Sequence, residues 1–301
     1  MRFPFTGVIP VDKPAGATSR QVVDAVGRAL SLRAVGHAGT LDPLAAGVVV
    51  VCVGHATKLV DFLHQLPKRY EVGFLLGRSS PSDDLETEVL EETEPRRPSR
   101  EEIDAALPAF RGAIRQRPCD YSAVHVGGQR AYRLARKGRA IEIAAKPVRI
   151  DRLEVTAYTW PRLALDVECS TGTYIRAIGR DLAAALGTRA VMERLMRTAV
   201  GPFERAGSLP LADATPAAVT AALLPAVAAV PHLPRVELSE AVLEAAVRGG
   251  LIEPGVPLNA GGPSPALPAA AACDAGGELV GILRLHASGR YRLRPNFRGH
   301  G

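Results

Sequence analysis

The chain has 301 residues, about twice the length of an average domain, so we expect one large domain with a smaller companion. Hydrophobic residues make up 47% of it and charged residues 23%, an ordinary globular composition that excludes collagen, coiled-coil rods and intrinsically disordered chains. The formal charge of +6 is uneven, because residues 83–104 carry ten acidic side chains against three arginines. A basic body with one acidic projection suggests a polyanionic partner.

Several classes of site are excluded by what the sequence lacks. The four cysteines form no C-x-x-C pair, so we predict neither a metal site nor a disulfide framework. Cys119 also lacks the second cysteine that a zinc nucleobase deaminase requires. No glycine-rich nucleotide-binding motif occurs, so no nucleotide cofactor is predicted. The longest apolar run, residues 44–53, is too short to span a membrane and no signal core precedes it, so we expect a cytoplasmic protein.

The first half of the chain reads as helices and strands separated by glycine-rich turns. Residues 16–30 predict a helix with Thr18 and Ser19 as cap candidates. A glycine-punctuated loop over 35–43 leads into the apolar run 48–53, which predicts a buried strand, and residues 70–76 predict another. Ser99 to Glu102 form a capping box, so a short helix is expected from there to about residue 107.

The second half begins with a clean alternation of apolar and polar residues over 162–170, which predicts a half-buried strand. Gly172 then turns the chain into a helix that ends before Gly187. Because strands and helices are mixed without a regular βαβ rhythm, the predicted class is α+β with a mixed sheet. The Ala- and Pro-rich segment 210–234 predicts a domain boundary. Beyond it we expect a small β-rich module with a helix over 239–248, a loop over 254–268, and strands over 279–285 and 291–293.

Asp42 is the first candidate for chemistry. Pro43 holds it in an extended conformation at the mouth of a strand, where an ionised, partly desolvated carboxylate suits a nucleophile or a general base. An ordinary Asp-Pro turn is the alternative. Tyr174 and Arg176 follow a strand-to-helix turn, where Arg176 is able to pair with Asp42 and Tyr174 offers a stacking face. The alternative is a first helical turn with one buried aromatic and one solvated cation.

Two segments have the composition of a nucleic-acid contact. Residues 116–138 interleave basic side chains with Tyr121 and Tyr132, which suits phosphate binding with base stacking, although a solvated helix face is equally consistent. Near the end, Arg290, Arg292 and Arg294 alternate with apolar residues and therefore share one strand face. Because like charges side by side repel, a polyanion is expected there.

Taken together, these segments resemble the bacterial tRNA pseudouridine-55 synthase family, TruB, strongly over residues 8–204. The tail resembles the family's PUA-like module more loosely, through residues 274–282 and the pair Arg294-Pro295. The matching motifs stand in the family's order: DKPAGATS at 12–19, GHAGTLDPLAAG at 36–47, GHATKL at 54–59, KRY at 68–70, YSA at 121–123, CSTGTYIR at 169–176, RT at 197–198 and GPF at 201–203.

The resemblance implies a pseudouridine-synthase-type fold: a mixed, largely antiparallel sheet flanked by helices, plus a small β-rich PUA-like C-terminal domain. It implies a catalytic domain over 1–230 and an RNA-binding domain over 231–301. The implied activity flips uridine 55 out of the T loop of tRNA, detaches uracil at N1 and reattaches it at C5. The resemblance implies no metal or organic cofactor, and a monomer that acts on the T arm without a protein partner.

It also implies roles for individual residues. Asp42 becomes the catalytic carboxylate, supported by Tyr70 and by Arg176 as its ionic partner. The substrate-binding residues implied are His37, which would contact the opened T loop, Tyr174 and Leu195, which would line the uracil pocket, and Gly39, Thr40, Lys13, Asp84, Arg136, Arg290 and Arg292.

The sequence departs from the family at two places. His125 stands where the family usually has a lysine, so a fixed positive charge becomes a titrating one. The acidic motif before it is eroded over residues 77–84, where Asp84 keeps the acidic position. Two other functions stay open: a non-catalytic tRNA-binding or RNA-folding protein on the same scaffold, for which Asp42 would be dispensable, and a nucleoside or glycoside hydrolase, which would need a second carboxylate.

Overall fold

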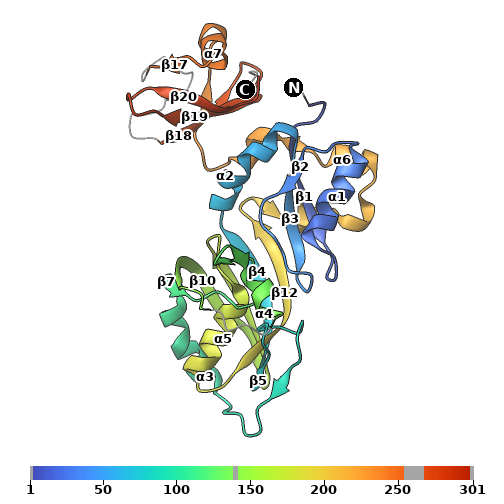
Figure 1. Ribbon diagram of the computed structural model, residues 1–301, viewed down its shortest axis with the longest axis vertical. Coiled ribbons are helices and arrows are strands. Elements are labelled where there is room, and N and C mark those ends of the chain that lie inside the picture. Colours follow the sequence, from blue (N-terminus) through green and yellow to red (C-terminus); the bar gives the residue numbers. More distant parts are fainter. Residues whose placement is uncertain (1–2, 138–141, 254–267, 299–301) are drawn as a thin grey trace.

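The structure is a computed structural model that describes residues 3–137, 142–253 and 268–298. Two sheets organise these residues, a large one and a small C-terminal one (Figure 1). The large sheet contains β1 (Gly7–Lys13), β2 (Val35–His37), β3 (Ala46–Val53), β4 (Lys68–Leu76), β7 (Gly112–Gln116), β10 (Lys146–Thr159), β11 (Arg162–Cys169), β12 (Ala190–Val200), β13 (Phe203–Glu204), β14 (Leu209–Pro210) and β15 (Leu224–Pro225).

The main path of this sheet runs in the order β14-β1-β3-β12-β4-β11-β10-β7. The β1–β14 and β3–β12 pairs are parallel, and the remaining pairs are antiparallel. The predicted α+β class with a mixed, largely antiparallel sheet is therefore confirmed. Helical segments flank the sheet: α1 (Ser19–Ala29), η1 (Gly54–Leu59), α2 (Val60–Gln65), α3 (Arg100–Ala106), η2 (Leu107–Phe110), α4 (Ala131–Ala135), α5 (Ile175–Ala185), η3 (Arg205–Gly207), η4 (Leu211–Asp213), α6 (Pro216–Ala221) and η5 (Ala226–Ala229).

β3 is buried on both of its faces, which explains its unbroken apolar sequence. Its odd-numbered residues from 49 to 53 join the core cluster that contains the apolar face of α1. Its even-numbered residues from 48 to 52 join a second cluster, which η1 and α2 cover. Two small hairpins lie outside this core: β5 (Arg78–Ser79) with β6 (Leu90–Glu91), and β8 (His125–Val126) with β9 (Gln129–Arg130).

Two predicted helix caps are confirmed, although α1 begins at Ser19 and not at residue 16. Thr18 caps α1 through a capping box with Gln21, and Ser99 caps α3 in the same way. Gly172, at φ +87°, makes the turn that leads into α5. Within α5, a Cβ at Gly179 would lie 2.1 Å from the ring of Phe74, so only glycine allows this helix to pack so closely on β4.

Residues 210–230 of the segment expected to be a domain boundary pack on the large body and do not form a linker, because Val219 of α6 and Val227 of η5 belong to its core clusters. β14 pairs in parallel with β1 at Leu209, and β15 pairs antiparallel with β1 at Leu224. The alanines and valines of η5 are mostly buried beside them. Strands of two residues are too short to show a periodic pattern, and a segment rich in alanine and proline resembles a linker in the sequence.

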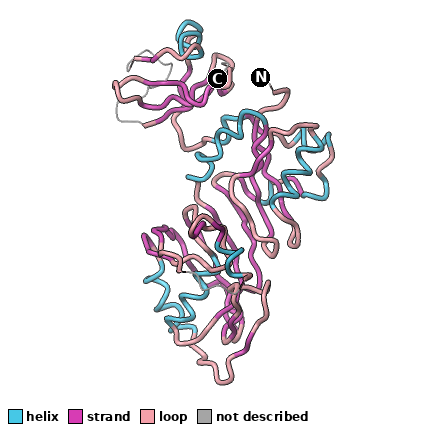
Figure 2. The backbone as a smooth tube through the Cα atoms, viewed as in Figure 1, coloured by secondary structure: helices cyan, strands magenta, loops and turns pink. Residues whose placement is uncertain are grey.

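The C-terminal module is β-rich, as predicted. Its order is β16-β18-β19-β20-β17, and it packs onto α2 because Ala271, Leu279 and Ile282 share a core cluster with Phe62 and Leu63 (Figure 2). The loop expected over 254–268 lies, apart from Pro268, outside the described residues. The elements of the module are β16 (Arg235–Glu237), α7 (Glu240–Val247), β17 (Leu251–Ile252), β18 (Ala269–Cys273), β19 (Leu279–Leu285) and β20 (Tyr291–Asn296).

Candidate active site

Asp42 lies on the loop that connects β2 to β3, and α1 holds that loop in place. The hydroxyl of Ser19 accepts a hydrogen bond from the Leu41 amide at 2.9 Å and donates to the Leu41 carbonyl oxygen at 3.1 Å. The Gly16 amide donates to the carbonyl oxygen of Pro43 at 2.7 Å. Both neighbours of Asp42 are thus fixed by their backbones, while its own side chain stays 42% exposed. The sequence indicated Ser19 only as a helix cap.

Arg176 lies beside Asp42 and is almost completely buried. Its Nη2 atom is 3.0 Å from Oδ2 of Asp42 and donates to the carbonyl oxygen of Tyr121 at 2.9 Å. Its Nη1 atom donates to the carbonyl oxygen of Ser82 at 2.7 Å and lies 3.4 Å from Oδ2 of Asp84, whose side chain is only 2% exposed. The guanidinium therefore joins an accessible carboxylate to a buried one. Burial opposes its charge, but Asp42, Cys119, Asp84 and Asp83 outweigh that effect and raise the pKa of Arg176.

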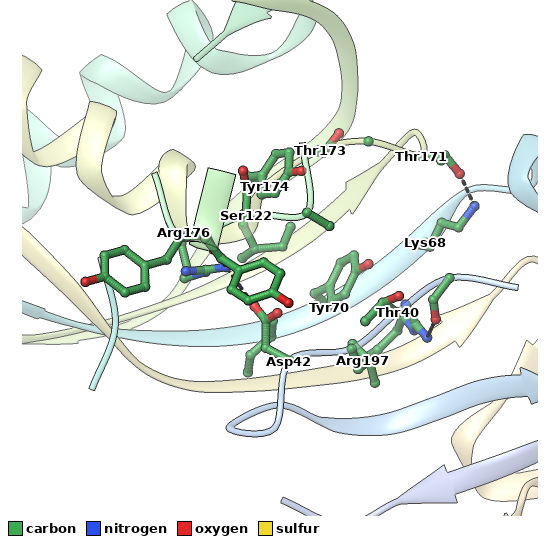
Figure 3. A pocket seen from close by; sticks show the side chains of 18 of the residues that line it. Thr40, Asp42, Lys68, Tyr70, Ser122, Thr171, Thr173, Tyr174, Arg176 and Arg197 are labelled. Carbon is green, nitrogen blue, oxygen red and sulfur yellow. Dashed lines mark hydrogen bonds and ion pairs between the residues drawn. The ribbon is translucent and has the colours of Figure 1, made fainter. Parts of the chain in front are cut away.

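A cavity of about 710 Å³ opens in front of this pair, and we call it the Asp42 pocket. Its volume is within the range that holds small organic ligands. Figure 3 shows Tyr70 and Tyr174 around the Asp42–Arg176 pair. Of the residues predicted from the sequence, those that line it are Gly39, Thr40, Asp42, Tyr70, Arg136, Tyr174, Arg176 and Leu195.

The two tyrosines give the pocket aromatic walls. Tyr70 comes from β4 and is 8% exposed, and Tyr174 is the cap residue of α5. Burial raises the pKa of both phenols, so both are neutral near pH 7. Leu195 of β12 completes an apolar surface beside them. Flat apolar walls beside the Asp42 carboxylate suit a planar, mostly uncharged ring.

Arg197 is a pocket residue to which the sequence assigned no role. It is 2% exposed, its Nε donates to the carbonyl oxygen of Val48 at 2.7 Å, and its Nη2 donates to that of Gly39 at 3.0 Å. Gly47 allows the backbones of β3 and β12 to approach closely here, because a Cβ at position 47 would lie 2.1 Å from the carbonyl oxygen of Arg197. Arg197 thereby ties β12 to the loop of Asp42. A motif of two residues, Arg197-Thr198, was the only sequence signal for it.

Lys68 is a second lining residue that the sequence left without a role. Its Nζ donates to the carbonyl oxygens of Leu66 at 2.7 Å and His64 at 2.9 Å, and also to the hydroxyl of Thr171. Burial lowers the pKa of Lys68 to about 8. The contacts join the end of α2 to the turn that precedes α5, so Lys68 shapes the pocket wall that faces Asp42.

Lys13 and Asp84 do not lie in the pocket, so placing them among its substrate contacts was wrong. Lys13 is fully buried, and its Nζ donates to the carbonyl oxygens of Pro14, Ala17 and Ala45, which leaves no donor for a ligand. Burial lowers the pKa of Lys13 to about 8. Asp84 lies behind Arg176, on the side away from the cavity. Its role is to hold the arginine.

His37 lies on β2, next to the loop of Asp42 but outside the pocket lining. Its Nδ1 atom is buried and has no hydrogen-bond partner among the described residues. Burial, followed by the positive charges of Arg197, His64 and Arg20, lowers the pKa of His37. A neutral imidazole is therefore favoured near pH 7.

The basic segment after β7 forms the rim of the pocket rather than a long helix. Arg130, Tyr132 and Arg136 line the cavity, whereas His125 is exposed in β8 and does not. Arg136 pairs with Glu86 across the rim, with Nη2 2.6 Å from Oε1. The guanidiniums of Arg133 and Arg136 each lie 5.9 Å from the Tyr132 ring. The rim combines positive charge with an aromatic face, as phosphate and base contacts require.

Arg290 and Arg292 are far from the Asp42 pocket, in the C-terminal module. Both are exposed, and Arg290 forms an ion pair with Glu253 at 2.7 Å. Within residues 3–137, 142–253 and 268–298, no three His, Cys, Asp or Glu side chains are grouped as metal ligands. No helix in the same ranges is long and apolar enough to cross a membrane.

Comparison with known proteins shows the family of the chain. The family described as TruB family pseudouridylate synthase (N terminal domain) matches residues 28–175. The tRNA pseudouridine synthase B of Mycobacterium tuberculosis H37Rv is 41% identical over 288 residues, which covers 92% of this chain and 91% of that protein. The protein of the same name from Mycobacterium sp. strain KMS is 46% identical over 209 residues, covering 68% of this chain and 70% of that protein.

Among solved structures, a chain of a Cbf5–Nop10–Gar1 complex superimposes with a TM-score of 0.74 at 24% identity, covering 97% of this chain and 85% of that one. A chain of an H/ACA RNP bound to a substrate RNA gives 0.71 at 24% identity, covering 97% and 84%. The fold is thus that of the pseudouridine synthases. The chain belongs to the TruB family of these enzymes, which are isomerases.

Proposed function

We propose that this protein converts uridine 55 in the T loop of tRNA to pseudouridine. The observation that carries the proposal is the ion pair between Asp42 and Arg176, 3.0 Å apart, at the wall of a pocket that Tyr70 and Tyr174 enclose. The curated relatives bear the name tRNA pseudouridine synthase B, which supports tRNA as the substrate. The protein works as a cytoplasmic monomer on the T arm, without metal, organic cofactor or protein partner.

The reaction breaks the bond between C1′ and N1 and forms one between C1′ and C5. C5 gives up a proton and N1 gains one, so the product is an isomer of the substrate. A uridine inside a folded loop reaches Asp42 only after it is flipped out, which costs a few kcal/mol. Asp42 acts either on the uracil ring or on the ribose side, through a covalent adduct or a glycal. Each route needs an ionised carboxylate within reach of the flipped nucleotide, either at its uracil ring or at its ribose.

The surrounding residues supply what that carboxylate needs. Once a base covers Asp42 and displaces water, Arg176 provides the opposite charge and fixes the direction of one carboxylate oxygen. Tyr70, Tyr174 and Leu195 hold the ring of the flipped base. Arg130 and Arg136 at the rim contact phosphates, and His37 contacts the opened loop. Residues 1–230 form the catalytic domain and 231–301 the RNA-contact domain.

An unmodified tRNA transcript that carries tritium at C5 of uridine tests the proposal. Wild-type protein is expected to release the label, and Asp42→Asn is expected to release none, since the amide is no nucleophile or base. Mapping the modified position by chemical sequencing locates it in the T loop. Unchanged RNA with both proteins would refute the proposal and favour an RNA-folding protein, and free uracil as a product would favour a hydrolase.

A further inference from the structure

Gln116, the last residue of β7, is a buried glutamine that holds the backbone of a pocket residue. It is 2% exposed and is not among the described residues that line the Asp42 pocket. Its side-chain amide forms two hydrogen bonds with Tyr174, which lies 58 positions further along the chain. Nε2 donates to the Tyr174 carbonyl oxygen at 3.0 Å, and Oε1 accepts from the Tyr174 amide at 2.8 Å. One side chain therefore binds both polar backbone groups of Tyr174.

Tyr174 needs this external partner because it does not cap its own helix. The side chains of Thr18 and Ser99 accept hydrogen bonds from the first turns of α1 and α3. The side chain of Tyr174, the cap residue of α5, forms no such bond among the described residues, and it lines the pocket instead. The backbone of Tyr174 is extended, with φ −93° and ψ 107°, so the Gln116 amide meets it as a neighbouring strand would.

The partners fix the orientation of the Gln116 amide. A backbone N–H only donates and a backbone carbonyl oxygen only accepts, so Oε1 must face the first and Nε2 the second. Any replacement for the amide must therefore present one acceptor and one donor side by side. A neutral carboxylic acid does so, a carboxylate presents acceptors alone, and a thioether replaces neither group.

The other pocket residue at the start of α5 has partners of its own. Arg176 contacts two carboxylates and two backbone carbonyl oxygens, none of which belongs to Gln116. Those contacts hold the guanidinium independently of the glutamine. Tyr174 is therefore the pocket residue whose position depends most directly on Gln116.

We propose that Gln116 is a positioning residue: it fixes the Tyr174 ring against the flipped base and thereby sets the rate of isomerisation, without touching the RNA. The inference rests on the proposed function, in which Tyr174 holds that base. A displacement of about 1 Å in a positioning group costs on the order of 10²-fold in rate. Because phosphate contacts supply most of the affinity for a nucleic acid, the tRNA Kd depends little on this position.

Gln116→Met removes both hydrogen bonds and keeps a side chain of similar length. With enzyme in excess over C5-tritiated tRNA, we expect the single-turnover rate of label release to fall on the order of 10²-fold. The tRNA Kd should stay within about twofold of that of wild type. Hydrogen exchange of the Tyr174 amide should become about tenfold faster or more, since this amide loses its acceptor.

Ser99→Ala is the matched control for the loss of a helix cap. Ser99 caps α3, and no described residue of α3 lines the Asp42 pocket. The substitution should lower the melting temperature, while the single-turnover rate equals that of wild type. The control therefore separates positioning of Tyr174 from a general loss of stability.

Gln116→Glu gives a readout that lost stability does not produce. At about pH 8 the carboxylate faces the Tyr174 carbonyl oxygen with a second acceptor, so the rate should match that of Gln116→Met. Burial raises the pKa of a glutamic acid, and its neutral form restores both hydrogen bonds. As pH falls toward about 5.5, the logarithm of the rate relative to wild type should rise by up to about one for each pH unit.

Other groups that titrate or carry charge cancel in this comparison, because wild type and Gln116→Met contain all of them. On the elements that meet at position 116 they are Arg117, Cys119, Lys146, Tyr174, Arg176 and Arg180.

The outcomes separate the two proposals. An active wild type with an equally fast Gln116→Met, or with unchanged exchange of the Tyr174 amide in that variant, would overturn the inference about Gln116 alone. A Gln116→Glu rate that equals the Gln116→Met rate at every pH would also overturn it. A wild type that releases no label, with faster exchange in Gln116→Met, would overturn the proposed function and leave Gln116 as an anchor of the backbone only. If Gln116→Met does not fold, the pH profile of Gln116→Glu decides.

Discussion

The guanidinium of Arg176 lies 3.0 Å from Oδ2 of Asp42 and presents its opposite side to the buried carboxylate of Asp84. Five N–H donors in one plane serve four acceptors, two carboxylates and two backbone carbonyl oxygens. Four segments that are distant in sequence meet at this one side chain: the loop before β3, the acidic segment after β4, the segment of Tyr121 after β7, and the first turn of α5. The position of Asp42 in the pocket therefore depends on all four.

Arg176→Lys should lose almost as much catalytic activity as Arg176→Met. A lysine keeps the charge, but one ammonium group cannot replace both Nη1 and Nη2 and reach all four acceptors. We expect label release from C5-tritiated tRNA to fall on the order of 10²- to 10³-fold for either variant, similar to the loss of one preorganised electrostatic contact. Arg180→Met is the control, since Arg180 is one turn further along α5 and pairs with Asp83 outside the pocket. Near-normal turnover in Arg176→Lys would contradict this account.

Lys13→Met should destabilise the protein without a direct effect on RNA contacts. Three carbonyl oxygens lose their donor in a fully buried environment, and each unsatisfied buried group costs about 1–3 kcal/mol. We expect a loss of at least about 2 kcal/mol in urea unfolding, with the salt slope of tRNA binding unchanged. Lys146→Met, at an exposed position of β10, should be close to neutral. A reduced salt slope in Lys13→Met would restore this lysine to the substrate-binding residues.

Gly47→Ala tests the close approach of β3 to β12. The new Cβ would lie 2.1 Å from the carbonyl oxygen of Arg197, and φ at Gly47 is +106°, so steric overlap adds to backbone strain. Gly112→Ala is the matched control, because its φ is +78° with no atom within 4 Å. We expect the free energy of unfolding to fall by about 1 kcal/mol in the control and by about 3 kcal/mol or more in Gly47→Ala. Urea unfolding measures both losses, and the melting temperatures should fall in the same order. Equal losses of stability in the two variants would mean that only the backbone conformation of Gly47 matters and that the close approach to Arg197 does not.

Local patterns in the sequence predicted much of this fold. Three kinds of local pattern are recognisable from the sequence because each involves only residues that are close in the chain. They are the alternation over β11, the capping boxes of α1 and α3, and the apolar run of β3. The Asp42 loop and the Arg176 turn were predicted by the same means.

What the patterns missed depends on contacts between distant segments. Arg197 and Lys68 satisfy backbone carbonyl oxygens across strands and helices, and no spacing in the sequence records which carbonyls those are. The same cause explains the misplacement of Lys13, because its three backbone acceptors cannot be recognised from the DKPAGATS motif. The acidic position of Asp84 was predicted, but not that it lies behind the arginine.

His37 makes the stability of the protein depend on pH in a defined direction. In the unfolded chain its imidazole titrates near 6.5, and in the folded protein burial and the charges of Arg197, His64 and Arg20 lower its pKa. Between the two values the unfolded state binds more protons, so the stability that His37 contributes is present above pH 6.5 and is lost as pH falls below it. Burial also lowers the pKa of His64 and His232, so they act in the same direction.

Replacing His37 by Gln should therefore make the free energy of unfolding depend less steeply on pH below pH 6.5. Urea unfolding at pH 7.5, 6.5 and 5.5 should show wild type losing more free energy of unfolding than His37→Gln over this window, where the histidine titrates. His125→Gln, at an exposed position of β8, serves as the control for a lost imidazole. If wild type and His37→Gln lose stability in parallel, the imidazole of His37 is protonated as easily in the folded protein as in the unfolded chain, and its burial beside Arg197 has no effect on its titration.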